Sequence, residues 1–148
     1  MKVVDANVLL YAVNVDAQHH TSSRNWLDQA LSGADTVGLS WIVLLAFVRL
    51  STKPGLFESP LEIEEALDQV EAWIAAPGAV TLGPGPNHAE LLRRALVDVG
   101  VGGNLVNDAH LAALAVEHHA DIVSYDNDFS RFPGVRWRTP DALLGSDN

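Results

Sequence analysis

The sequence contains no cysteine among its 148 residues, and it has only 9 lysines and arginines against 19 acidic residues. The absence of cysteine excludes disulfides, thiolate zinc sites and cysteine nucleophiles. It is also typical of proteins that work in a reducing compartment, so we expect a cytoplasmic protein. Any catalytic or metal site must therefore be built from oxygen and nitrogen atoms.

Long apolar runs are absent as well. The longest extends from Trp41 to Val48, far short of the roughly 18 residues that a membrane span requires. Near the N-terminus, Asp5 introduces a charge before an apolar segment can form, which is unlike a signal peptide. We therefore expect neither a cleaved leader nor an association with membranes.

Positive charge is scarce, and the net charge is −10. Because phosphate recognition usually depends on a basic surface, this charge argues against tight, unaided binding of nucleic acid. However, a bound cation partly neutralises the acids that hold it, and the few bases are clustered, with Arg131, Arg136 and Arg138 close together. An acidic surface also suits a basic protein partner. The charge alone therefore does not decide the function.

The length is typical of one domain, and we expect residues 1–148 to form one. Short apolar segments, predicted to be strands, alternate with longer segments of helical periodicity. This alternation predicts an α/β fold with a mainly parallel central sheet. The predicted strands are 2–5, 36–39, 79–82, 122–125 and 135–138. The predicted helices are 8–13, 41–52, 60–76, 88–99 and 104–119, together with one that is capped within 20–23 and ended by Gly33.

Three acidic residues stand where such a fold places its sites, outside the C-terminal ends of parallel strands. Asp5 ends the first predicted strand, Asp126 follows the strand 122–125, and Asp108 lies early in the helix that leads into that strand. If the two strands are neighbours, the three carboxylates share one cleft. Each placement also has an ordinary explanation, since aspartate is common in turns and favourable near helix starts. Only the combination favours a site.

Carboxylates gathered in one cleft repel one another unless a cation lies between them. Oxygen ligands without cysteine favour hard ions such as Mg²⁺ or Mn²⁺ over zinc. A divalent ion held beside a phosphodiester can activate water and stabilise the departing oxygen. The pattern therefore indicates metal-dependent phosphodiester hydrolysis.

At these residues the sequence resembles the PIN-domain family, and specifically the VapC ribonuclease toxins of bacterial toxin–antitoxin pairs. The resemblance covers nearly the whole chain and depends on the order and spacing of its segments, since no single fragment is specific. It implies a three-layer α/β/α fold with a mainly parallel central sheet. The segments that carry it are residues 3–10, 39–41, 47–50, 103–115, 124–129 and 132–135.

The resemblance implies a pocket of four catalytic aspartates. Mg²⁺, or Mn²⁺ in its place, would be bound chiefly by Asp5 and Asp108, with Asp126 as a further ligand and Asp128 completing the pocket. It also implies endonucleolytic cleavage of a structured RNA such as tRNA or rRNA. The implied protein partner is a cognate VapB-type antitoxin, which inhibits the toxin, often as a homodimer within a larger toxin–antitoxin complex.

One position departs from the family pattern. Many PIN domains carry a glutamate on the helix after the second strand, where this chain has Ala46. An alanine cannot bind a metal, so water would take that coordination position, or metal affinity and activity would fall. The alternative function is thus a module that binds RNA or an antitoxin with weak or no catalysis.

Three further residues are candidates for supporting roles. Asn7 and Ser124 are placed to orient the acidic side chains, although a plain turn role also fits Asn7. Arg49 could face a substrate phosphate or form an exposed salt bridge.

The histidines are not predicted to bind metal. The pairs His19-His20 and His118-His119 lack partners at zinc-ligand spacing, and His110 is about 200° around the helix from Asp108.

Overall fold

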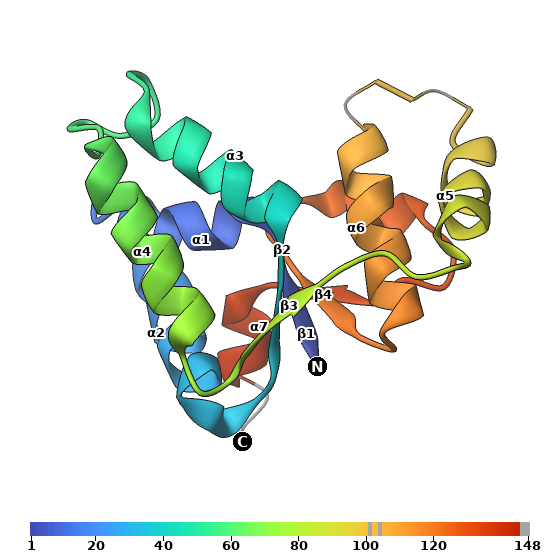
Figure 1. Cartoon of the computed structure of the whole chain (residues 1–148), viewed down its shortest axis with the longest axis horizontal. Coiled ribbons are helices and arrows are strands. Elements are labelled where there is room, and N and C mark those ends of the chain that lie inside the picture. Colours follow the sequence, from blue (N-terminus) through green and yellow to red (C-terminus); the bar gives the residue numbers. More distant parts are fainter. Residues whose placement is uncertain (101, 104, 146–148) are drawn as a thin grey trace.

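The computed structural model describes residues 1–100, 102–103 and 105–145, and at its centre lies a five-stranded sheet (Figure 1). The strand order is β3-β2-β1-β4-β5, and all four neighbouring pairs are parallel. The predicted parallel sheet is thus confirmed. The strands are β1 (Lys2–Val4), β2 (Val37–Ser40), β3 (Ala79–Leu82), β4 (Asp121–Val123) and β5 (Trp137–Arg138).

Helices cover both faces of the sheet, which confirms the three-layer arrangement. Figure 1 shows α1 to α4 and α7 on one side of the strands and α5 and α6 on the other. The helices are α1 (Ala6–Val13), α2 (His20–Gln29), α3 (Trp41–Thr52), α4 (Ile63–Ala75), α5 (His88–Val97), α6 (Leu105–Glu117) and α7 (Pro140–Gly145), with a π-helical turn at Ala30–Ala34 and a 3₁₀ turn at Asn127–Arg131.

The central strands are apolar because both of their faces are covered. A strand between two helical layers has no solvent-facing side, so its residues read as a continuous apolar run. Val3 and Val4 of β1 and Ile122 and Val123 of β4 are all fully buried. Burial of both faces places these two strands within the hydrophobic core.

The register of the two central strands determines where the candidate site lies. Val4 of β1 pairs with Val123 of β4, so the next residues, Asp5 and Ser124, leave the sheet together at its C-terminal edge. The backbone N–H of Asp5 donates to the Val123 carbonyl at 3.0 Å, which extends the pairing to that edge. The predicted adjacency of the first strand and the strand before Asp126 is therefore confirmed.

Several predicted helix starts are wrong because tertiary contacts and caps compete with local signals. The helix predicted from Pro60 begins at Ile63, where Glu62 and Glu65 form a reciprocal capping box. Residues 20–23, predicted to hold the cap of α2, lie inside that helix, which begins at His20. The predicted start of α5 at His88, directly after Asn87, is confirmed, although the Asn87 side chain forms no capping bond.

The C-terminal segment and the strand ends also differ from prediction. The expected tail contains α7, whose first turn is stabilised by a 3.1 Å hydrogen bond from the Ala142 N–H to the Thr139 hydroxyl oxygen. Strand β5 spans only two of the four predicted residues, and the predicted start of the helix at Asn104 lies outside the described residues. No helix in the described part of the chain is both long and apolar enough to cross a bilayer.

Candidate active site

Asp5 begins the site at the end of β1. It is the N-cap of α1, and its Oδ1 accepts a 2.8 Å hydrogen bond from the backbone N–H of Ala6. Its Oδ2 accepts from the Ser124 hydroxyl at 2.7 Å and from the Asn7 amide at 3.3 Å. Burial is the largest influence on this carboxyl and raises its pKa, against the opposing effect of the hydrogen bonds.

Ser124 links the two halves of the site through one hydroxyl group. Its side chain is fully buried, and its oxygen accepts from the Asn7 amide at 3.1 Å and from the Asp126 backbone N–H at 2.9 Å. Together with the bond donated to Asp5, these contacts use the single donor and both acceptor positions of a hydroxyl. Ser124 thereby holds residues from the two ends of the sequence in a fixed relation.

Asn7 completes this network from the first turn of α1. Its side-chain oxygen accepts a 3.2 Å hydrogen bond from the backbone N–H of Tyr125. Since its amide group already donates to Asp5 and Ser124, the side chain bridges α1 to the segment after β4. Both supporting residues expected near Asp5 are thus in direct contact with it.

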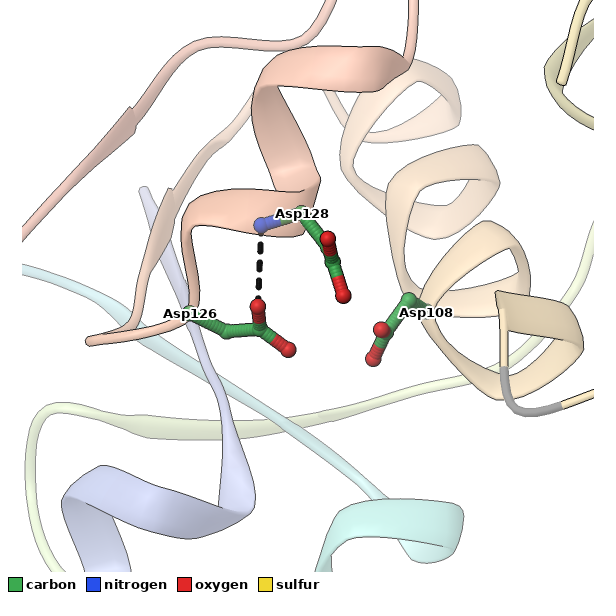
Figure 2. A group of neighbouring side chains, drawn as sticks. All are labelled: Asp108, Asp126 and Asp128. Carbon is green, nitrogen blue, oxygen red and sulfur yellow. Dashed lines mark hydrogen bonds between the residues drawn. The ribbon is translucent and has the colours of Figure 1, made fainter.

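Three carboxylates face one another beside this network. Asp108 reaches the site from the first turn of α6, while Asp126 and Asp128 come from the segment after β4 (Figure 2). One oxygen from each lies within 4.8 Å of the others, close enough to hold one metal ion. Asp126 also accepts a 2.8 Å hydrogen bond from the backbone N–H of Asp128, which fixes the tight turn between them.

The electrostatics of the cluster are unfavourable without a cation. The pKa of Asp108 is raised to about 7, first by burial and then by the charges of Asp5, Asp126 and Asp128. The raised pKa of Asp5 likewise includes a contribution from Asp126. Asp108 therefore interacts with each of the other three predicted aspartates, and Asp5 interacts also with Asp126. A divalent cation would relieve this repulsion.

The arrangement of the four acids differs in one respect from the expected ligand set. The three carboxylates that approach within 4.8 Å are those of Asp108, Asp126 and Asp128, whereas Asp5 is not in that group. Asp5 lies deeper, with both oxygens already accepting hydrogen bonds. The all-carboxylate composition fits Mg²⁺ or Mn²⁺, which prefer oxygen ligands and keep several waters.

Helix α3 contributes no acid to the site. It carries no acidic residue along its length, and Ala46 is half-exposed in its middle. Arg49 is exposed near its C-terminal end and forms no ion pair within the described part of the chain. The basic residue in contact with the acidic cluster is Arg131, whose Nε lies 3.5 Å from Asp128 Oδ1.

A hydrogen-bonded chain of three titratable residues joins α5 to α6 and was not predicted. Glu117 contacts His88 Nδ1 and also accepts a 2.6 Å hydrogen bond from the backbone N–H of Gly85. His88 Nε2 lies 2.9 Å from His110 Nδ1. His110 and Glu117 are seven residues apart and therefore share one helical face, which was the only sequence signal for this contact.

Comparison with known proteins relates the chain to one family. Residues 2–135 match the family model described as PIN domain. Ribonuclease VapC37 of Mycobacterium tuberculosis (strain ATCC 25618 / H37Rv) is 65% identical over 144 residues, which cover 97% of this chain and 100% of that protein.

The fold is shared with solved structures, among them a VapBC complex and a VapC toxin. VapBC2 from Rickettsia felis, bound to a DNA fragment from its promoter, superposes with a TM-score of 0.69 at 19% identity, over 93% of this chain and 97% of that one. VapC20 of Mycobacterium tuberculosis, described as a sarcin–ricin-loop-cleaving toxin, gives a TM-score of 0.67 at 17% identity, over 92% and 99%. At these identities the likeness establishes the architecture alone.

Proposed function

The chain belongs to the PIN-domain family, and within it to the VapC ribonucleases; on that basis we propose that it is a metal-dependent endoribonuclease and the toxin of a type II toxin–antitoxin system. The observation that carries the proposal is the convergence of Asp108, Asp126 and Asp128 within 4.8 Å. Asp5 interacts electrostatically with Asp108 and Asp126 from the adjacent strand end. The expected cofactor is Mg²⁺, with Mn²⁺ as a substitute.

Each part of the site has a role in this activity. Asp108, Asp126 and Asp128 would bind the metal through the oxygens that already converge, and Asp5 would contribute from the deeper side of the pocket, held in position by Ser124 and Asn7. The bound metal would supply a water of lowered pKa and stabilise negative charge on the departing oxygen. Because the acids repel phosphate, RNA enters the pocket only when this charge has been neutralised.

The substrate that we propose is a structured cellular RNA, of the tRNA or rRNA class, whose cleavage would arrest translation and growth. Support comes from the ribonuclease name of the 65% identical relative. The description of VapC20 as a toxin that cleaves the sarcin–ricin loop points in the same direction, although that protein shares only the fold.

We further propose that a cognate VapB-type antitoxin restrains the enzyme in the cytoplasm, in a complex containing a toxin homodimer. The net charge of −10 would attract a basic segment of such a partner. The Rickettsia felis neighbour is a VapBC assembly bound to promoter DNA, which is consistent with this organisation.

The proposal is tested by incubating the purified chain with total RNA and with tRNA. Cleavage is expected with Mg²⁺ or Mn²⁺, is expected to stop in excess EDTA, and should return when the metal is restored. Sequencing of the new 5′ ends would identify the substrate. Cleavage that persists in EDTA would show that the metal assignment is wrong.

A second candidate function follows from Ala46 and the absence of any acid on α3. If the site lacks a ligand that catalysis needs, the chain would bind RNA or an antitoxin without cutting. RNA that is bound in the presence of Mn²⁺ but remains intact would favour this binding module over the enzyme.

The hydroxyl of Ser124 provides a sharper test of the site. We expect Ser124→Ala to lower metal affinity and cleavage about 10-fold or more, because partners that orient metal ligands typically contribute 10- to 100-fold. The matched control is Ser130→Ala, since Ser130 is exposed and, among the described residues, its hydroxyl bonds to the Asn127 carbonyl alone. Equal metal titrations and cleavage rates for the two variants would refute a role for Ser124 in positioning Asp5.

A further inference from the structure

Both tyrosines of the chain lie together with a histidine next to the acidic pocket. The ring of His19 stacks on that of Tyr125 with centroids 4.1 Å apart and planes 14° apart. Tyr11 is tilted against both, with its centroid 5.5 Å from Tyr125 and 5.8 Å from His19. These three residues form what we call the aromatic cluster.

The aromatic cluster is attached directly to the acidic site. Tyr125 stands between Ser124 and Asp126, and its backbone N–H donates to Asn7. Tyr11 follows Asn7 by four residues on α1, so the two side chains share one face of that helix, about 5–6 Å apart. The cluster therefore begins about one helical turn from the residue that orients Asp5, a distance comparable to one nucleotide.

Its burial distinguishes this cluster from the aromatic residues of the core. Phe47 is fully buried and Trp73 is 6% exposed, whereas all three members of the cluster are half-buried. The Tyr125 hydroxyl donates to Asp141 Oδ1 at 2.5 Å, which fixes that ring from the α7 side. Within the described part of the chain, the ring contacts of His19 are only with Tyr11 and Tyr125. Since His19 is half-buried, part of its surface is accessible to solvent.

We propose that the aromatic cluster binds an unpaired base of the RNA substrate, stacked on His19, next to the phosphate held at the acidic pocket. This inference rests on the proposed ribonuclease function and names the substrate class as a nucleotide splayed out of a loop or single strand. An acidic chain gains little affinity from phosphate contacts. Stacking provides affinity without positive charge and tolerates any base.

The test measures binding separately from cleavage. In an Asp108→Asn background, a 5′-fluorescein RNA hairpin with an eight-nucleotide loop is titrated by fluorescence anisotropy with Mg²⁺ present, and the fully paired duplex serves as comparison. His19→Ala is expected to weaken hairpin binding about 10-fold, with little effect on the duplex. His19→Phe should restore binding because a ring is restored.

Matched controls separate stacking from folding and charge. His118→Ala removes a histidine whose ring contacts the Gly83 carbonyl, and should leave hairpin binding unchanged. His19→Ala loses the stack on Tyr125 and should melt at a slightly lower temperature, whereas His19→Phe keeps a ring at that place and should melt close to the unaltered chain. In the otherwise unaltered chain, His19→Ala should raise KM for cleavage of the hairpin while leaving kcat nearly unchanged.

The outcomes distinguish this inference from the function on which it rests. If the unaltered chain cleaves RNA but His19→Ala binds the hairpin equally well, the aromatic cluster is not a base site and the ribonuclease assignment stands. If binding depends on the ring but no cleavage occurs, the base site stands and the enzyme assignment fails. If the change weakens antitoxin binding but not RNA binding, the cluster is a peptide site and the inference is overturned.

Discussion

Replacement of Asp108 by asparagine is expected to reduce metal-dependent RNA cleavage by at least about 100-fold, as is usual when a charged group at a reaction centre is lost. Asparagine has nearly the same shape but cannot supply the negative charge that holds a divalent ion. Asp108 is also the one member of the group Asp108, Asp126 and Asp128 that reaches the site from α6. The measurement is the initial rate of cleavage of a defined RNA with saturating Mn²⁺.

The control is Asp68→Asn, which makes the same change of charge at an exposed position on α4. It should leave the rate unchanged. The metal-free Asp108→Asn protein should unfold at a higher temperature than the unaltered chain at pH 8, because the substitution removes repulsion within the cluster. A variant that loses activity because it is unfolded would show the opposite shift. Cleavage at an undiminished rate would exclude Asp108 from the site.

The second large effect is a steep dependence of metal affinity on pH. The pKa of Asp108 is raised to about 7 in the metal-free protein, so this carboxyl is protonated below pH 7 and a metal must displace the proton. We expect the apparent dissociation constant for Mn²⁺ to rise about tenfold for each pH unit below 7, as one-proton competition requires. The raised pKa of Asp5 adds to the slope.

Isothermal titration calorimetry between pH 5.5 and 8, in two buffers of different ionisation enthalpy, measures both the affinity and the protons released. Asp108→Asn is the informative comparison, since any remaining binding should lose most of this pH dependence. Constant affinity from pH 5.5 to 7, with no proton release, would contradict the assigned pKa and the role of Asp108 as a ligand.

The same raised pKa has a defined consequence for stability. A carboxyl whose pKa is higher in the folded than in the unfolded state contributes stability below its unfolded pKa, and this contribution is lost as the pH rises through the folded value. For Asp108 this contribution to stability is lost between about pH 4 and about pH 7. The metal-free protein should therefore lose thermal stability across this range, and added metal should restore it.

The sequence determined much of the architecture because the signals are local. Apolar runs such as Ile122-Val123, interrupted by helical periodicity, indicate buried parallel strands, and the rule that sites form at their C-terminal ends located Asp5 and Asp126. The family resemblance made the departure at Ala46 equally visible, since comparison with the family pattern requires only the residue type at that position. These features require no knowledge of where individual side chains point.

Helix boundaries were less predictable because competing caps differ by small free energies. Pro60 is a typical first helical residue, yet the reciprocal bonds of Glu62 and Glu65 start α4 three residues later. The segment after β5 lacks a long periodic pattern, so α7 could not be recognised. Whether such a short segment forms a helix depends on its packing in the tertiary structure, because a short helix has little stability of its own.

The aspartate site shows most clearly which features follow from the sequence and which depend on the tertiary structure. The residue pattern indicated three acids in one pocket, and the family resemblance added Asp128. Only the tertiary structure grouped Asp108 and Asp126 with Asp128 and left Asp5 deeper, bonded to Ser124. The aromatic cluster and the Glu117–His88–His110 chain likewise emerged only on folding. The physical reason is that Ser124 and Asp5 lie 119 positions apart, and contacts over such separations depend on strand register and side-chain rotamers, which no local pattern encodes.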